Sequence, residues 1–574
     1  MILVNIISSF ILLGGILFYR YIFPKRSINL FFLLILISIL PIISIFRIGT
    51  YESGDLSIHV KITMGFYQSL KEGNLLPRWN GYSSGGYGGP DFIFLYILPY
   101  YLISLIHFLG ISFLTSAKIF LATSFIASGI TIYWWLKESF GQKSALVGAI
   151  FYQFAPYHLV DLHFRADVGE VLAFAIFPLL FVFIKQLADT GKIIFTIFFA
   201  ISSTLLLLSH TTMFYTGIPL SVLYFIILWF QKSNKKRHQL FQLSFALIFC
   251  LLLSMFYWLP LISQSKFLHY GITQHIALHT IPEILYSPWR YGLLFQGHHG
   301  ELSYLIGYTQ LFAVVLSIFI IGFRRTGKKS LLLKYFVFSF LILCLLMLNI
   351  SKPIWVFVPF MDKFMDSHRL LLPISFLISG IIGFISKYFI KKNYILFILC
   401  FFAIFTTILN WGNRRTLPAV GDSILKAELL KNTNGHDLID PKWVDVNANW
   451  SIRKPRETLE AINGNVFIYS TPNTGTKHSY DIHLESDTLL RENTYYFPGW
   501  KVKVDGKLTP FDYQNGLFPG IITFRLPKGN YHIEVVYENP GIQKISNWIS
   551  FLTFCAMLFY ILFYIKSEID VPKI

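Results

Sequence analysis

Residues 28–55 read INLFFLLILISILPIISIFRIGTYESGD, an apolar run that ends near Arg47 and is followed by a short polar stretch leading to Asp55. An apolar run of about 20 residues is long enough to cross the hydrocarbon core of a bilayer as a helix, so residues 28–47 are predicted to span a membrane. Similar runs fill the rest of the chain, which is 54% hydrophobic and only 14% charged, whereas a soluble domain has about 25% charged residues. This composition excludes a soluble enzyme and predicts a polytopic helical membrane protein.

About thirteen spans are predicted from runs of this kind. They cover residues 2–19, 28–47, 118–136, 144–160, 171–187, 193–209, 213–230, 240–259, 302–321, 331–349, 370–386, 394–410 and 546–565. The first run has no basic segment before it and no small-residue cleavage site after it, so we expect a retained helix and not a signal peptide.

The basic loops between the spans predict the orientation of the chain. Lys and Arg gather at residues 20–26, 137–143, 232–237, 324–329 and 387–392 and after Lys566. Because basic loops stay in the cytoplasm, the N-terminus is predicted outside the plasma membrane and the C-terminus inside it. The long polar segments, residues 48–117, 161–170, 260–301, 351–369 and 412–545, are then extracytoplasmic.

One apolar stretch, residues 92–109, would reverse this orientation if it crossed the membrane. We therefore predict that it is re-entrant or interfacial, which suits its Pro99 and its pair Tyr100-Tyr101, because aromatic residues collect at the headgroups.

The net charge of +18 and the cysteines exclude two other classes of protein. Basic loops account for much of the charge, so no nucleic-acid partner is expected. All four cysteines lie within apolar runs and are interpreted as small core residues, not as disulfides or metal ligands.

From residue 412 the composition becomes polar and the apolar residues alternate with a period of two, which is typical of strands. In KVKVDGK, Val502 and Val504 share one face, and Asp505-Gly506 suits a tight hairpin turn. The sequence therefore predicts three parts: a transmembrane module (residues 1–411), an extracytoplasmic β-sandwich-like domain (412–545) and a final span with a tail (546–574). Four aromatic residues of the β-rich segment are interpreted as core, with a sugar-stacking platform as the alternative: Trp443, Trp450, Trp500 and Tyr513.

Asp55 is the first candidate for chemistry. A helix that starts there places His59 four residues later on the same face, so the carboxylate and the imidazole can act together. They would serve as a general base or as ligands of a divalent cation, Mg²⁺ or Mn²⁺. The alternative is that Asp55 only caps the helix. Arg78 and Trp79 follow in the same loop, before a glycine-rich stretch that lets the backbone approach a ligand or another segment closely, or that is simply a flexible turn.

The order of these features, Gly-Asp-x-x-x-His, amphipathic helix, Pro-Arg-Trp, glycine-rich turn and aromatic re-entrant run, resembles the first extracytoplasmic loop of GT-C glycosyltransferases. It is most similar to the YfhO-like bacterial membrane proteins and the 6-pyruvoyl-tetrahydropterin synthase-related membrane proteins. The segments YYFPGWKVKVDGK and LPKGNYHIEVVYENPG also resemble the terminal β-domain of the YfhO group. The resemblance implies a GT-C helical bundle, a polyprenyl-phosphate-linked sugar donor, Asp55 as catalytic base, and inversion at the anomeric carbon. His59 has no universal counterpart, and a second acidic residue beside Asp55 is absent.

A donor of this kind needs cations for its departing phosphate at the membrane surface. Arg165 is a candidate to bind that phosphate and Glu170 to orient it or the sugar; the alternative for this loop is a solvated turn with an internal ion pair. Arg369 is a second phosphate candidate, or an interfacial arginine that reaches the headgroups. His210 lines the cavity or caps its helix.

The sequence therefore predicts a membrane glycosyltransferase that transfers a sugar to an envelope glycan, lipid or protein on the extracytoplasmic face. Two alternatives stay open: a transporter or flippase of lipid-linked glycans, and a non-catalytic glycan-binding scaffold. The predicted spans carry few ionisable residues near their midpoints, where coupled transporters usually place them.

Overall fold

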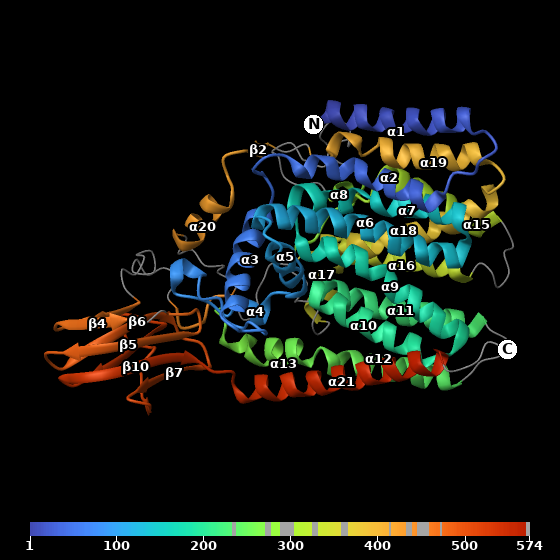
Figure 1. The fold of residues 1–574 in the computed structure, drawn as a ribbon. Coiled ribbons are helices and arrows are strands. Elements are labelled where there is room, and N and C mark those ends of the chain that lie inside the picture. Colours follow the sequence, from blue (N-terminus) through green and yellow to red (C-terminus); the bar gives the residue numbers. More distant parts are fainter. Residues whose placement is uncertain are drawn as a thin grey trace.

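The computed structural model describes residues 1–231, 237–269, 277–286, 304–323, 331–357, 366–412, 415–431, 439–444, 458–470 and 473–569. Its helices form an elongated bundle, and the strands of the C-terminal half lie at one end of it (Figure 1). The protein is mostly helical with a β-rich C-terminal region, as the sequence predicts.

Seven helical segments of the described residues are long and apolar enough to cross a membrane. They are α1 (Ile2–Ile22), α6 (Phe113–Phe140), α9 (Val168–Thr190), α11 (Thr211–Gln231), Ser367–Phe389 around α18 (Leu371–Ser386), Asn393–Asn410 beginning with α19 (Asn393–Phe405), and Gly541–Lys566 within α21 (Gly541–Ile569). Four shorter apolar helices coincide with further predicted spans: α2 (Leu30–Ile42), which a 3-10 turn extends to Phe46, α10 (Ile193–Ser209), α15 (Tyr308–Phe323) and α16 (Leu331–Met347). Every predicted span thus overlaps a helix, but the count of thirteen membrane crossings is not confirmed.

Two predicted spans are broken. The span predicted at 240–259 consists of α12 (Arg237–Leu253) and α13 (Met255–Gln264), which are bent by 67° at Ser254. The Ser254 hydroxyl donates to the Cys250 carbonyl, a side-chain bond that favours helix bending. The span predicted at 144–160 consists of α7 (Gln142–Gln153) and α8 (Pro156–Val160), because proline cannot continue a helix from the preceding turn.

The stretch predicted to be re-entrant or interfacial contains α4 (Asp91–Phe94) and α5 (Leu98–Phe108). The 11 residues of α5 rise only about 16 Å, roughly half the thickness of a bilayer core. The length of α5 agrees with a segment that does not cross.

The β-rich region contains a five-stranded and a three-stranded sheet, both antiparallel. The larger sheet has the order β4 (Val466–Ser470), β5 (Lys477–Leu484), β10 (Gly529–Tyr537), β7 (Trp500–Val504) and β8 (Lys507–Thr509); the smaller one has β3 (Leu459–Ala461), β6 (Thr488–Tyr495) and β9 (Ile521–Leu526). Side chains of both sheets, such as Leu490 and Ile533, meet in one apolar cluster, as in sheets packed face to face. The predicted hairpin turn at Asp505-Gly506 is confirmed, since both residues have positive φ and join β7 to β8.

The aromatic residues interpreted as core differ in burial. Trp500 is 3% exposed and belongs to the apolar cluster of the sheets. Trp443 is partly buried and contacts Phe267 and Tyr513. Trp450 lies outside the described residues.

The predicted boundary at residue 412 is crossed by contacts with the first loop (residues 48–117). Strand β1 (Thr50–Tyr51) pairs with β2 (Thr416–Leu417), and α20 (Asp422–Lys431) packs against α3 (Leu56–Lys71). The Asp422 carboxylate accepts hydrogen bonds from the first backbone amides of α6, Phe113 at 2.7 Å and Leu114 at 3.0 Å. The segment that follows the bundle therefore fixes the loop that carries Asp55.

Candidate functional site

Asp55 occupies the cap position of α3, but its side chain makes no capping hydrogen bond. The Ser53 hydroxyl accepts the Leu56 amide at 3.3 Å instead. Two backbone bonds hold this turn against the second polar loop: Gly54 N donates to Phe164 O at 2.8 Å and Asp55 N to Arg165 O at 2.7 Å. In the part of the chain that the structure describes, the Asp55 carboxylate has no hydrogen bond or ion pair. The geometry therefore does not support the interpretation of Asp55 as a mere helix cap.

The environment of Asp55 favours its protonated form. Burial raises the pKa of Asp55, and the nearby Asp167 carboxylate raises it further, while His59 and Arg165 act in the opposite direction. A carboxyl group whose pKa is raised toward the working pH is a stronger general base than an ordinary aspartate.

His59 is buried on the next turn of α3 and lies between two tyrosines of the stretch predicted to be re-entrant. Its Nδ1 is 3.0 Å from the Tyr100 hydroxyl and its Nε2 is 3.4 Å from the Tyr96 hydroxyl. Because Tyr96 donates to Asp167 Oδ1 at 2.8 Å, its oxygen is left to accept from His59 Nε2, and Nδ1 then accepts from Tyr100. This chain of hydrogen bonds ties the first loop to the second. It occupies both nitrogens of His59, so it does not favour His59 as a metal ligand.

Arg165 lies at the end of a single π-helical turn, Asp161–Arg165, and is 7% exposed. Its NH1 donates to Asp161 Oδ1 at 2.9 Å and to Glu170 Oε1 at 3.0 Å, and its NH2 donates to Asp167 Oδ2 at 3.1 Å. NH1 also lies 3.0 Å from the Tyr157 hydroxyl. The structure therefore engages this guanidinium with three carboxylates. The loop is an internal ion-pair cluster, as in the alternative interpretation, but it is buried and not solvated.

Asp167 is placed by its own helix. It caps α9 by accepting the amides of Gly169 at 2.9 Å and Glu170 at 3.1 Å. Burial alone would raise the pKa of Asp167, but Arg165 and then His210 hold it well below its usual range. Asp167 is therefore ionised.

Glu170 is fully buried and contacts three further side chains. Arg369 Nε lies 3.2 Å and His210 Nε2 lies 3.6 Å from Glu170 Oε1, while the Tyr157 hydroxyl donates to Oε2. Burial and the neighbouring Arg369 lower the pKa of His210 to about 4, so the imidazole is neutral at pH 7. Among the described residues neither nitrogen of His210 has a hydrogen-bond partner, although the residue is only 2% exposed. Arg369 keeps 17% of its side chain exposed, which makes it the more accessible of the two arginines.

The same cluster could hold a divalent cation. Ligand atoms of Asp167, Glu170 and His210 lie within 4.8 Å of one another. Two carboxylates and a neutral imidazole are suitable ligands for a transition metal, and the unpartnered His210 nitrogens fit that role. Arg165 and Arg369 already offset the negative charges of Asp167 and Glu170, however, so these two carboxylates have counter-charges without an ion. This set of ligands differs from the predicted pair of Asp55 and His59.

Arg78 and Trp79 lie in contacts with other parts of the molecule. Arg78 is 4% exposed and donates to Phe256 O at 2.6 Å and Asn547 Oδ1 at 2.9 Å. Pro260 has no amide with which to bond the Phe256 carbonyl within α13, so that oxygen is available to Arg78. Trp79 packs against Trp500 and Tyr537 in the β-rich region, at ring distances of 5.4 and 5.9 Å. These contacts join the first loop to α13, α21 and the β-rich region.

The glycine-rich stretch serves the same joint. A side chain at Gly81 would meet the backbone of Gly475, and one at Gly88 would meet the Trp79 ring. The stretch therefore lets the first loop approach the β-rich region closely.

The structure adds three tyrosines to the site that the sequence did not give as site candidates, Tyr96, Tyr100 and Tyr157. It also brings in Asp161 and Asp167, which the sequence places in one loop with Arg165 and Glu170 but to which it assigns no role. Only Asp167 carries a local signal, since an Asp three residues before a Glu at the start of an apolar run is typical of a helix cap.

Residues 94–414 match the sequence profile of a family described as a 6-pyruvoyl-tetrahydropterin synthase related domain, a membrane protein. The chain belongs to this family. The family match confirms the predicted resemblance to membrane proteins of this group. It covers most of the bundle, including Arg165, Glu170 and Arg369. A protein of Lactococcus lactis subsp. cremoris (strain MG1363), named only as uncharacterized, is 25% identical over 323 residues, which are 54% of this chain and 52% of that protein. The chain thus spans about half the length of this relative.

The solved structures that the chain matches include two enzymes. The arabinofuranosyltransferase AftD from Mycobacteria has a TM-score of 0.44 and 15% identity, over 68% of this chain and 27% of that one. The oligosaccharyltransferase of Archaeoglobus fulgidus, solved with zinc and sulfate, has a TM-score of 0.38 and 12% identity, over 70% of this chain and 53% of that one.

Proposed function

We propose that this protein of the 6-pyruvoyl-tetrahydropterin synthase related family is a membrane glycosyltransferase. It transfers a sugar from a polyprenyl-phosphate-linked donor to an envelope glycan, lipid or protein on the extracytoplasmic face of the plasma membrane. The observation that carries the proposal is the position of Asp55: a partly buried carboxylate without a described partner, beside a buried cluster of arginines and carboxylates built from separate loops.

The chemistry requires a base, and Asp55 takes that role. The acceptor hydroxyl attacks the anomeric carbon of the donor, its proton passes to the Asp55 carboxylate, and the bond between the anomeric carbon and the phosphate oxygen breaks. The electron pair of that bond leaves with the polyprenyl phosphate. Attack from the face opposite the phosphate inverts the anomeric carbon.

The departing phosphate requires positive charge. Arg369 supplies it, because its guanidinium contacts only one described carboxylate and remains partly exposed. Arg165 is a positioning residue: its ion pairs hold Asp167 and Glu170 in place, and these carboxylates are among the groups around Asp55. A divalent cation bound by Asp167, Glu170 and His210 would add a Lewis acid for the same phosphate.

The test compares wild type with Asp55→Asn in lipid nanodiscs, using a panel of radiolabelled polyprenyl-phosphate sugars with and without EDTA. We expect sugar release or transfer by wild type and its loss in the variant. Glu52→Gln is the matched control, since Glu52 is a carboxylate of the same loop, 4.0 Å from Arg415 and with 43% of its side chain exposed, and it should retain activity.

Equal behaviour of wild type and Asp55→Asn, on lipids that demonstrably bind, would contradict the proposal. A transporter of lipid-linked glycans or a glycan-binding scaffold would then be favoured. Inhibition by EDTA that added Mg²⁺ or Mn²⁺ reverses would establish the cation.

A further inference from the structure

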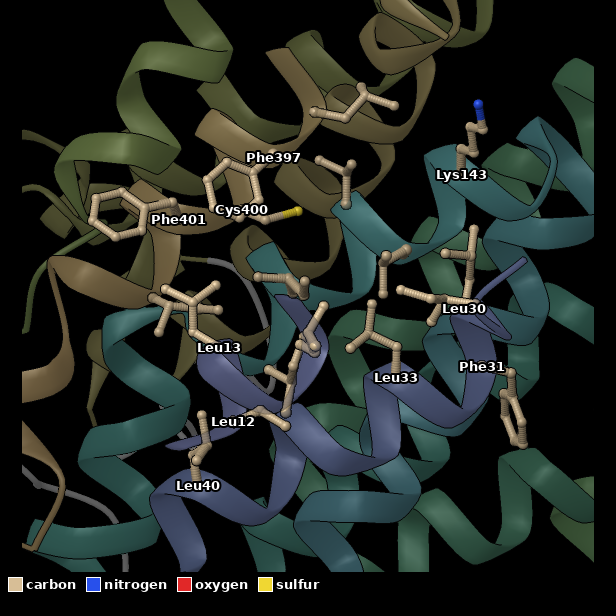
Figure 2. Close-up of a pocket in the computed structure, with 18 of the residues that line it drawn as sticks. Leu12, Leu13, Leu30, Phe31, Leu33, Leu40, Lys143, Phe397, Cys400 and Phe401 are labelled. Atoms are coloured by element: carbon tan, nitrogen blue, oxygen red, sulfur yellow. The ribbon is translucent and has the colours of Figure 1, made fainter. Parts of the chain in front are cut away.

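A large cavity that the described residues of the candidate site do not line lies between α1, α2, α6, α7 and α19 (Figure 2). Its volume is about 1700 Å³, more than a typical site for a drug-sized ligand. Most of its wall is apolar, with Leu13, Leu33 and Phe397 among the lining side chains. Such a wall suits hydrocarbon chains.

Helix α1 forms one side of this cavity and stands apart from the bundle. Many of its apolar side chains are exposed, including Phe10 and Leu17. Its buried Asn5 donates to the carbonyls of Trp411 at 2.8 Å and Ile408 at 3.2 Å, which fixes one end of the helix. The cavity is therefore bordered by a helix that faces the lipid of the bilayer.

One end of the cavity is strongly basic. Of the described residues that line the cavity, five carry a positive charge and none is Asp or Glu. They are Arg20, Lys25, Arg26, Lys137 and Lys143, all of them exposed. Within the described residues none of the five forms a salt bridge. Their hydrogen bonds are to neutral groups, as between Lys143 Nζ and Asn393 Oδ1 at 2.9 Å. This end therefore offers positive charge to an anion from outside the chain.

The basic end lies at the opposite end of the helices from the candidate active site. Helix α2 starts at Leu30 beside the basic residues, and its C-terminal end leads through β1 to Asp55. The turn between α1 and α2 likewise lies at the end of the bundle away from the strands (Figure 1). An anion bound at the basic end therefore cannot be the group that reacts at Asp55.

We propose that the cavity binds one anionic phospholipid of the surrounding bilayer. Its phosphate contacts the five basic residues, and its acyl chains lie between α1, α2 and α19. Basic pockets between membrane helices bind anionic headgroups in this way. The apolar wall, which extends beyond the basic residues, would hold the acyl chains. A polyprenyl-phosphate donor shares this chemistry, but its phosphate would have to reach the other end of the bundle. The proposal does not depend on the proposed enzymatic function.

The charge is tested by native mass spectrometry of the full chain, purified in detergent and titrated with phosphatidylglycerol or phosphatidylcholine of matched acyl chains. We expect wild type to retain phosphatidylglycerol preferentially. Lys25→Gln/Lys137→Gln removes two cations that have no described side-chain bond. It should weaken retention about 30-fold, since a basic residue near a lipid surface contributes roughly 1 kcal/mol and 1.4 kcal/mol is tenfold in affinity.

Two matched controls separate this site from general surface charge and from folding. Lys391→Gln/Lys392→Gln removes two exposed cations that do not line the cavity and should leave retention unchanged. Leu13→Trp fills the apolar part and should abolish retention without a change of charge. Leu17→Trp, on the exposed side of the same helix, should leave lipid retention unchanged.

Three results would overturn the proposal. One is equal retention of the two lipids by wild type; another is equal loss in the two double lysine variants. The third is co-purification of a polyprenyl phosphate that phosphatidylglycerol does not displace.

Discussion

The first loop contributes residues to two regions of the molecule, one polar and charged and the other apolar and aromatic. At the start of α3, Asp55 and His59 border a buried cluster in which charges face one another. Beyond the end of α3, Trp79 and Tyr87 join the apolar cluster of the β-rich region, where aromatic rings pack. The polar end can do chemistry and the aromatic end can only hold position. The loop thus couples a candidate reaction centre to a scaffold, and substitutions at the two ends should fail in different ways.

The largest effect is expected for Asp55→Asn. A general base contributes about 10²- to 10⁴-fold to a rate, so transfer should fall by that factor. Because the Asp55 carboxylate has no hydrogen bond or ion pair within the described residues, the unfolding temperature should stay close to that of wild type. Transfer kinetics and thermal unfolding of the same preparations measure the two quantities. A fall in unfolding temperature that parallels the loss of rate would mean that Asp55 is structural.

Glu170→Gln should instead affect stability. The substitution leaves the buried guanidinium of Arg165 and the partly exposed guanidinium of Arg369 with one carboxylate fewer. Breaking a buried pair in this way costs roughly 3–5 kcal/mol. Thermal unfolding in detergent should show a marked decrease. The control is Asp189→Asn, which breaks the exposed pair with Lys185 and should cost at most about 1 kcal/mol. Equal unfolding temperatures for the two variants would show that the cluster contributes no more than a surface pair.

Trp79→Ala tests the aromatic end. Removing a fully buried tryptophan costs about 3–5 kcal/mol through the cavity it leaves. We expect faster proteolysis of the β-rich region and preserved transfer at low temperature. Trp548→Ala is the matched control, because Trp548 is 63% exposed on α21. Complete loss of transfer with an unchanged proteolysis pattern would place Trp79 in the reaction site, as the sequence predicted.

Local features of the fold could be predicted from the sequence because they depend on neighbouring residues. The apolar runs located the helices, the Asp505-Gly506 pair located a hairpin, and the spacing of four residues placed Asp55 and His59 on one helix face. The breaks in two helices were not predicted, since the run around Ser254 is apolar throughout and hydropathy does not record a bend.

The candidate site was predicted only in part. Tyr96 and Asp167 are 71 residues apart in the chain and share a hydrogen bond, and no spacing rule relates them. The sequence predicted Arg78 to bind substrate, because its partners are 178 and 469 residues away: the Phe256 carbonyl, which Pro260 leaves free, and the Asn547 side chain. Sequence patterns identified residues with unusual chemistry, but they could not determine whether a given charge meets a substrate or another part of the chain.

The smallest effect, and the most specific to the polar end, is on the pH dependence of transfer. Asp55 must be deprotonated to act as a base, and its pKa is raised by burial and then by Asp167. Activity should therefore be lost on acidification at a higher pH than an ordinary aspartate would require. Asp167→Asn removes the neighbouring negative charge and keeps a good helix cap, because Asn caps as well as Asp. The acid limb of the rate profile should then shift to lower pH, while Glu52→Gln should leave it in place. A shift of the acid limb to higher pH in Asp167→Asn would contradict this prediction. It would show that Asp167 stabilises the ionised Asp55 carboxylate, for example through a bound cation.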